Sequence, residues 1–194
     1  MGHSQTEKAE SRERILEAAS RQVRQGGLDS VSIPQLMKKA GLTHGAFYAH
    51  FPSRADLLVS AVDRALSDGE AASTAAASAK GQPTLKAIVN SYLTPQHSAA
   101  TGRGCAVSAL VGDAARADEE VRELMRKYFQ RFISKTTEAV GDNAAARKIA
   151  VSSWCTMVGA LALSRLFDNE KDVNEILREA RSAILEREHA LMED

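Results

Sequence analysis

Apolar residues recur every three or four positions along most of the chain, which is the spacing of one face of an α-helix. A first helix is predicted over residues 11–26 and ends at Gly26 and Gly27. Two shorter amphipathic segments follow it, hinged at Gly41, and another helix begins at Ser53. The N-terminal part of the chain is therefore predicted to consist of short helices.

The rest of the chain is predicted to form five further helices. They are expected over residues 84–93, 105–116, 118–140, 143–167 and 173–188, with a polar, flexible segment at 96–104 after Pro95. Residues 68–83 are rich in Ala, Ser and Gly, and their weak pattern does not decide between helix and loop. Together the pattern predicts an all-α fold of about nine helices. We place one domain at residues 1–66, with 1–10 as a flexible arm, and a larger one at 67–194.

The segment from residue 32 to residue 57 has the local chemistry of a helix-turn-helix. Ser32 is placed to cap one helix, and Gln35 three residues later completes a capping-box pattern. Gly41 is able to adopt the left-handed conformation that ends a helix, and Thr43 is placed to cap the next one. This segment is the most informative part of the sequence.

Polar side chains on the second helix of this segment are not explained by packing. Tyr48 and His50 lie on its polar face, and the basic residue Arg54 follows just beyond it. In a helix-turn-helix, one helix crosses the DNA backbone and the next enters the major groove. The three residues therefore favour a DNA-binding role.

The same segment resembles the DNA-binding domain of the TetR family of bacterial transcriptional repressors. The resemblance is carried by Ala40-Gly41-Leu42, Thr43, Gly45, Phe47, Tyr48, His50, Phe51, Ser53, Arg54 and Leu57. Arg54 replaces the usual Lys but keeps its charge, and Pro34 is a less ordinary occupant of the first helix. The resemblance covers residues 12–66, and the remainder is matched only by length and helical content.

The resemblance implies a ligand-responsive regulator, by family default a repressor, that binds a pseudo-palindromic operator in double-stranded DNA as a homodimer. The expected DNA contacts are Arg12, Ser32, Lys38, Thr43, His44, Gly45, Ala46, Tyr48, His50 and Arg54. His44 is the only long donor among the residues expected at base edges, whereas Tyr48 and Arg54 are expected at the backbone. For Lys38, an ordinary solvated lysine is an equally good interpretation.

The resemblance also implies a dimer in which the last two helices of each copy form a four-helix interface. The expected interface residues are Trp154, Met157, Val158, Leu161, Ile176 and Ile184. The same apolar residues also suit an ordinary core, and the sequence does not separate the two interpretations.

Charge is unevenly distributed along a chain that is neutral overall. From Arg12 to Arg54 there are seven basic and three acidic residues, an excess of +4, whereas residues 66–194 have 16 basic and 18 acidic residues, or −2. A positive end on a neutral body attracts phosphate locally. An ordinary solvated helix face is the alternative interpretation of these basic residues.

An effector site is expected in the second domain, for a small and largely apolar ligand. The candidate lining residues are Tyr92, His97, Cys105, Phe129, Phe132, Trp154 and Phe167, each of which also suits a core. Cys105 follows Gly102-Arg103-Gly104 at a predicted helix start, where the helix dipole and Arg103 favour a negative charge. A thiol-based sensor of oxidants or electrophiles that uses Cys105 is therefore an alternative.

Other classes of protein fit the sequence less well. No apolar run approaches the roughly 18 residues of a membrane span, and the polar start MGHSQTEKAE lacks the core of a signal peptide, so we expect a cytoplasmic protein. Two cysteines fifty residues apart predict neither a disulfide framework nor a zinc site, and no cofactor is expected. Cys105 and His97 would make an incomplete catalytic pair, so no enzyme is predicted. A helical ligand-binding protein without DNA binding remains the other alternative, against which Tyr48, His50 and Arg54 argue.

Overall fold

The computed structural model describes residues 5–78 and 84–192, and every regular element within these ranges is helical. Its elements are α1 (Gln5–Gly26), η1 (Leu28–Ser30), α2 (Ile33–Lys39), η2 (His44–Ala49), α3 (Arg54–Ser78), α4 (Leu85–Tyr92), α5 (Pro95–Ala99), α6 (Ala106–Ala114), α7 (Glu119–Val140), α8 (Ala144–Ser164) and α9 (Glu170–Met192). The two η elements are short 3₁₀ helices. The predicted all-α class is confirmed.

The first helix begins earlier than predicted. Residues 5–10, expected to belong to a flexible arm, form the first turns of α1, and residues 1–4 lie outside the described residues. The segment is Gln-Thr-Glu-Lys-Ala-Glu, which contains good helix formers and no Gly or Pro to stop the helix. The apolar residues Ile15, Leu16, Ala19 and Val23 of α1 are buried, and α1 packs against α3 and α2.

The turn of the helix-turn-helix forms as predicted, but its caps do not. Gly41 has a φ of 73°, the left-handed conformation that Gly tolerates best. Ser32 and Thr43 occupy the N-cap positions of α2 and η2, yet neither side chain makes a capping hydrogen bond. Their backbone carbonyls act instead, accepting from the N–H groups of Leu36 and Ala46. The hydroxyls are therefore not used to start these helices.

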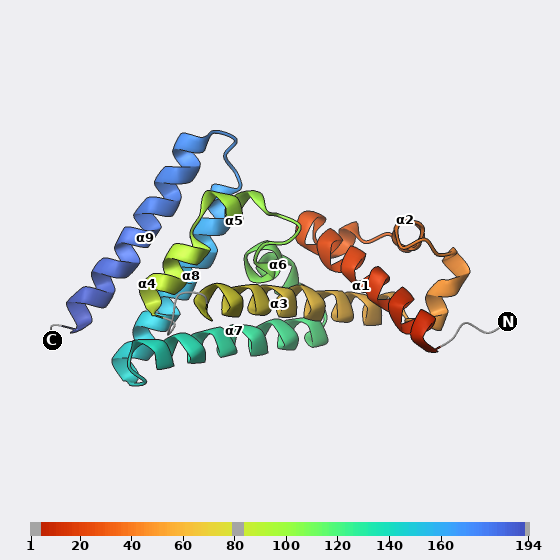
Figure 1. Cartoon of the computed structure of the whole chain (residues 1–194), viewed down its shortest axis with the longest axis horizontal. Helices are drawn as coiled ribbons and strands as arrows, with labels where there is room; N and C mark the ends of the chain where they lie inside the picture. The colour runs from red at the N-terminus through yellow and green to blue at the C-terminus, as the bar shows by residue number, and fades with distance from the viewer. Residues whose placement is uncertain (1–4, 79–83, 193–194) are drawn as a thin grey trace.

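Helix α3 connects the helix-turn-helix to the rest of the molecule. Ser53 caps it as predicted, because its Oγ accepts from the Asp56 N–H at 3.1 Å. The helix continues through residues 68–78, which the sequence left undecided, whereas residues 79–83 lie outside the described residues. In Figure 1, α3 runs lengthwise beside α7. A domain boundary at residue 66 would fall inside this helix and stays a prediction.

The chain has two apolar cores: the N-terminal helices enclose the first with α6 and α7, and α4, α7, α8 and α9 enclose the second (Figure 1). Helix α8 packs against α7 and α9, and α4 packs against α3 and α9. Thr84 and Asn143 cap α4 and α8 with their side chains. The segment 96–104, expected to be flexible, begins with α5, because Thr94 Oγ1 accepts from the His97 N–H and Pro95 occupies the first turn. In the described part of the chain, no helix is long and apolar enough to cross a membrane.

Candidate DNA-binding face and effector cavity

The short helix η2 separates a buried aromatic from an exposed one. Phe47 is fully buried and stacks against Phe51, with ring centroids 5.8 Å apart. The next residue, Tyr48, is 68% exposed, and its ring meets that of Phe47 edge-on at 5.2 Å. Since Phe47 anchors the turn, the Tyr48 hydroxyl is held outside the fold with its hydrogen-bonding capacity free for solvent or a ligand.

The residues expected to meet base edges are accessible in the N-terminal head, which runs from α1 to the start of α3. Thr43, His44 and Gly45 are exposed, and Ala46 is half-buried. No atom lies within 4 Å of the position that a side chain at Gly45 would occupy, so the backbone there is open to a close approach. A base edge would therefore have access to this segment.

A cluster of positive charge lies around His50. The pKa of His50 is lowered, first by burial and then by repulsion from Lys8, Arg12 and Arg14. Its Nδ1 is buried without a hydrogen-bond partner among the described residues. The Arg12 guanidinium sits over the Phe51 ring, 4.9 Å from its centroid, which holds that charge in place. Such a cluster would be neutralised by a phosphate group.

Lys8 joins this cluster although the sequence did not point to it. It contributes only because α1 extends to Gln5, so the predicted arm concealed it. Arg14 is partly committed to the protein, since its Nε donates to the Ala40 carbonyl at 3.3 Å and its Nη2 to Ser11.

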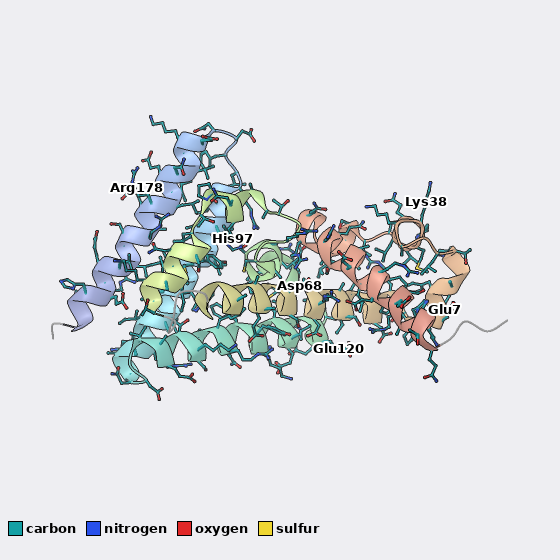
Figure 2. All side chains as sticks on the ribbon, in the orientation of Figure 1. Glu7, Lys38, Asp68, His97, Glu120 and Arg178 are labelled. Atoms are coloured by element: carbon teal, nitrogen blue, oxygen red, sulfur yellow. The ribbon has the colours of Figure 1, made fainter. Side chains whose placement is uncertain are left out.

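The other predicted DNA contacts have mixed surroundings. Lys38 is exposed at the end of α2 and points away from the body of the molecule (Figure 2). Ser32 is half-buried. Arg54 is exposed, but its Nη2 donates to the Leu28 carbonyl at 3.1 Å, so only its remaining donors are free for phosphate.

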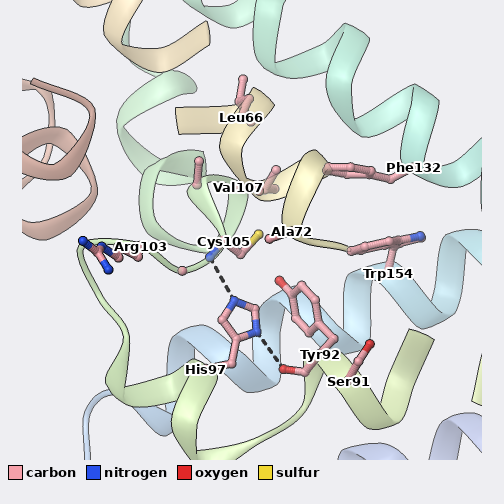
Figure 3. Close-up of a pocket in the computed structure, with 13 residues that line it drawn as sticks. Leu66, Ala72, Ser91, Tyr92, His97, Arg103, Cys105, Val107, Phe132 and Trp154 are labelled. Carbon is pink, nitrogen blue, oxygen red and sulfur yellow. Dashed lines mark hydrogen bonds between the residues drawn. The ribbon is translucent and has the colours of Figure 1, made fainter. Parts of the chain in front are cut away.

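A cavity of about 180 Å³ lies where α3, α4, α6, α7 and α8 meet (Figure 3). Its lining consists of Leu66, Gly69, Ala72, Ser91, Tyr92, His97, Arg103, Gly104, Cys105, Ala106, Val107, Phe132 and Trp154. Five of the seven predicted pocket residues are among them. Phe129 lies instead on an outer groove with Cys155 and Val158, and Phe167 is 42% exposed beyond the end of α8. Neither residue lines this cavity, and their role at an effector site stays a prediction.

His97 is fixed at one end of the cavity by two hydrogen bonds (Figure 3). Its Nδ1–H donates to the Tyr92 carbonyl at 2.7 Å, and its Nε2 accepts from the Cys105 backbone N–H at 3.0 Å. This arrangement needs the neutral ring, and burial lowers the pKa of His97. The contact with Cys105 is through the backbone and not the thiol, which argues against a nucleophile–base pair.

Tyr92 brings a buried hydroxyl into the cavity. The residue is 9% exposed, and its Oη has no hydrogen-bond partner of good geometry among the described residues. Burial raises the pKa of Tyr92 well above its ordinary value, and the nearby Cys105 adds to the effect, whereas Arg165 and Ser108 oppose it. Cys105 and Ser108 are thus close to the hydroxyl, but neither satisfies the geometry of a hydrogen bond. A buried polar group without a partner is costly, so this hydroxyl favours a ligand that completes its bonding.

Arg165, at the end of α8, lies directly behind the cavity wall. It donates to the Ser98 carbonyl and to Ser108 Oγ, each at 3.2 Å, while its Nη2 is buried without a partner among the described residues. Burial lowers the pKa of Arg165, and Cys105 and Tyr92 partly offset this. Arg165 is not among the site residues predicted from the sequence.

Gly104 allows the guanidinium to approach the cavity. A Cβ at Gly104 would lie 2.8 Å from Arg165 Nη2 and 2.7 Å from the Ala100 carbonyl, so no larger residue fits without a shift. The positive charge is therefore brought up to the wall that Gly104 and Cys105 form.

The family model of bacterial regulatory proteins, tetR family, matches residues 15–61, which contain the helix-turn-helix and the start of α3. The chain belongs to the TetR family. Like other members it is a DNA-binding transcriptional regulator, and the family is not one of enzymes.

Relatives match the chain over most of its length. An HTH-type transcriptional regulator of Mycobacterium tuberculosis, MT0206, is 27% identical over 187 residues, covering 90% of this chain and 94% of that protein. A TetR regulator from Chloroflexus aurantiacus has a TM-score of 0.79 at 19% identity, covering 93% of this chain and 96% of that one. SCO4454 from Streptomyces coelicolor, also of the TetR family, has a TM-score of 0.77 at 24% identity and covers 94% and 96%. These two structures establish the fold over more than nine-tenths of the chain.

Within this TetR-family fold, most of the predicted interface residues are core. Trp154, Met157, Leu161 and Ile184 are at most 4% exposed in a single chain, so they are not exposed for contact with a second copy. Val158 and Ile176 are half-buried against the two apolar cores. Neighbouring helices of the same chain, chiefly α7 and α9, cover these residues, and their role in a dimer interface stays a prediction.

The outer face of α8 carries apolar residues that the chain itself does not cover. Val151 is 37% exposed, and Leu163 and Leu166 are 55% and 74% exposed. Between them, Gly159 faces open space, and Cys155 is exposed. An exposed apolar stripe of this kind is typical of an interaction surface.

Arg24 joins the head of this TetR-family chain to the cavity. Its side chain is 2% exposed; Nε donates to the Gly102 carbonyl at 3.0 Å and Nη1 to the Ala65 carbonyl at 3.1 Å. Asp68 lies 3.5 Å from Nη2. Burial lowers the pKa of Arg24, and Asp68 opposes that effect. Because Gly102 immediately precedes Arg103 and Gly104 of the cavity lining, one side chain contacts α1, α3 and the cavity turn.

Proposed function

We propose that this protein is a repressor of transcription that binds a pseudo-palindromic operator as a homodimer and leaves it when a small effector fills the cavity. Repression is the default within the TetR family. The proposal places the protein in the bacterial cytoplasm, with DNA binding in residues 1–66 and effector binding and dimerisation in residues 67–194.

The exposed Tyr48 beside the cationic cluster at His50 is the observation that carries this proposal. Contacts with the phosphates of the DNA backbone set the register of a protein on DNA. Hydroxyl and basic side chains make such contacts. Tyr48, Arg12 and His50 supply these groups, and Arg54 adds its remaining donors. His44 would then read a base edge in the major groove.

The exposed stripe of α8 supports the dimer. A two-fold axis places two recognition helices about one DNA turn apart, or a multiple of it. A single head with an excess of +4 is weakly charged for DNA binding, and pairing doubles the number of phosphate contacts. We assign the interface to Val151, Leu163 and Leu166 in place of the buried residues predicted from sequence.

Two bridges support the coupling between cavity and head. Arg24 contacts α3 and the turn at Gly102, and the Leu28 N–H donates to Asp113 Oδ2 of α6 at 3.1 Å. Both α3 and α6 contribute residues to the cavity. A ligand that fits better with one separation of the two helices would shift the heads toward the matching spacing, which is the requirement for allostery.

Selection from a pool of random DNA duplexes by the purified protein, followed by sequencing of the retained fraction, tests the proposal. Recovery of one pseudo-palindrome supports a dimeric, sequence-reading regulator and gives the half-site spacing. Enrichment of a single half-site would contradict the dimer, and no enrichment even at low salt would contradict DNA binding by the effector-free protein.

A further inference from the structure

We propose that the effector is a small aromatic carboxylate, bound with its ring beside Trp154 and Phe132 and its carboxylate on the Tyr92 hydroxyl. That this ligand acts as an effector rests on the proposed function, whereas its binding can be measured on the free protein.

The size of the cavity limits the ligand. A volume of about 180 Å³ is close to that of an apolar cavity of about 150 Å³ that accepts benzene, and it is below the roughly 300 Å³ of typical drug-sized pockets. The space therefore fits one ring with one small substituent.

One side of the cavity is suited to a flat ring. Phe132 and Trp154 stack with centroids 4.9 Å apart and an interplanar angle of 18°, and Tyr92 meets Trp154 edge-on at 5.5 Å. Trp154 is fixed because its Nε1 donates to Thr136 Oγ1 at 2.7 Å. Figure 3 shows these rings along one side of the cavity, with Leu66 and Val107 near them. Aromatic rings favour offset or edge contacts with a further ring.

The other side presents an unsatisfied donor. Tyr92 Oη is buried without a partner of good geometry, and it faces the space beside Cys105 (Figure 3). His97 cannot serve it, because both ring nitrogens of His97 are already occupied. A carboxylate oxygen would accept from this hydroxyl in a charge-assisted bond, which is stronger than a bond to a neutral acceptor.

The charges around the cavity select an anion. No Asp or Glu is among its described lining residues, whereas Arg103 lines it and Arg165 lies behind Gly104. Among the described residues, the groups that affect the pKa of Arg165 are Cys105 and Tyr92, and neither is a carboxylate. The stacked rings alone would also suit a quaternary ammonium ion, but the buried guanidinium of Arg165 would repel it, whereas Arg103 is exposed and points away from the cavity (Figure 3).

The first test uses the fluorescence of Trp154, the single tryptophan of the chain, in the free protein. Benzoate, benzamide and benzyltrimethylammonium are titrated separately. Benzoate should change the emission saturably and bind at least about tenfold more tightly than benzamide, because the bond to a charged acceptor is the stronger one. Equal binding of benzamide, preference for benzyltrimethylammonium, or no saturable change would each overturn the proposal.

Two variants localise the carboxylate. Tyr92→Phe keeps the ring and removes the hydroxyl, so benzoate affinity should fall about tenfold while benzamide affinity changes less. Tyr128→Phe is the matched control, because the Tyr128 hydroxyl contacts Ser67 and Asp63 and Tyr128 is not among the residues that line the cavity. A Tyr92→Phe protein that binds benzoate as tightly as wild type would overturn the assignment to Tyr92.

The inference and the proposed function fail separately. If the protein selects an operator but benzoate does not perturb Trp154, only the effector class is wrong. If benzoate binds as expected but no duplex is enriched, the cavity assignment stands and the regulator proposal fails.

Discussion

The DNA-binding head and the effector cavity are built in opposite ways. The head takes most of its exposed groups from one short stretch, residues 43–54, and α1 adds Lys8 and Arg12 beside it. The cavity combines residues from Leu66 to Trp154, with Arg165 behind its wall. The first is set by local rules of turn and anchor, and the second by packing between distant helices.

The two regions share one property that relates structure to binding. Each contains a buried polar atom without a partner among the described residues, Nδ1 of His50 in the head and Oη of Tyr92 in the cavity. In both places basic groups lie nearby: Lys8, Arg12 and Arg14 around the first, and Arg165 near the second. Both sites are thus suited to an anion, a phosphate in one and a carboxylate in the other.

The largest expected effect separates anchor from contact within the head. Phe47→Ala should lower the free energy of unfolding by about 3–5 kcal/mol, because it leaves a cavity at a fully buried aromatic. Tyr48→Ala, one residue along and 68% exposed, should change it by less than about 0.5 kcal/mol. Urea denaturation of both variants measures the difference. Similar losses would show that Tyr48 is part of the core.

Arg24→Met tests the bridge between the regions. We expect a loss of about 2 kcal/mol, since the Gly102 and Ala65 carbonyls lose a buried donor while Asp68 retains Arg64 at 2.7 Å. Arg21→Met is the control on the same helix: Arg21 forms an exposed pair with Glu17 and should cost less than about 0.5 kcal/mol. Thermal denaturation compares the two. If the bridge also transmits the effector signal, Arg24→Met should weaken release of the selected duplex by benzoate, and unchanged release would contradict that role.

The next effect concerns the pH dependence of DNA binding. The pKa of His50 is lowered in the free protein, and a bound phosphate would raise it, so operator affinity should increase as the pH falls from 8 to 6. In His50→Gln, the increase in operator affinity between pH 8 and pH 6 should be about tenfold smaller than in wild type. His97→Gln, remote from DNA, is the control and should retain it. Fluorescence anisotropy with the selected duplex gives both curves, and identical slopes for all three proteins would exclude His50 as the titrating group.

The smallest effect concerns stability against pH in the body. His97 has a folded-state pKa below its ordinary value of 6.5, so the fold favours the neutral ring while the unfolded chain takes up a proton below that pH. Its contribution to stability is therefore present above about pH 6.5 and is lost as the pH falls below it. His97→Gln should lose less stability than wild type between pH 7.5 and 5.5, by under about 1 kcal/mol. Exposed His44→Gln should behave as wild type in the same melting experiment.

The sequence predicted most of the head because its determinants are local. The positive φ of Gly41, the Ser53 cap and the burial of Phe47 all follow from residue type and spacing over a few positions. The failures in this region are also local, since the backbone carbonyls of Ser32 and Thr43 accept the bonds expected of their hydroxyls.

Much less of the cavity could be predicted. Arg165 contacts Ser98 and Ser108, which are 67 and 57 positions away, and nothing in a local pattern indicates such pairs. Phe129 and Phe132 share one apolar pattern on α7, yet only Phe132 reaches the cavity. Likewise, Trp154 is apolar enough for a dimer interface, and only the packing of α7 and α4 shows that it is core. A lone Arg directly after the long apolar helix α8 was the available signal.

The most direct test of the account is the affinity of wild type and Tyr48→Ala for the selected duplex, measured by anisotropy over a range of salt concentrations. For wild type, the logarithm of the association constant should fall linearly with the logarithm of salt concentration, with a slope of roughly −0.9 per phosphate contact. Tyr48→Ala should bind at least about tenfold more weakly at every salt concentration, with its melting temperature unchanged. Equal affinity of the two proteins would contradict the docking of this face on DNA.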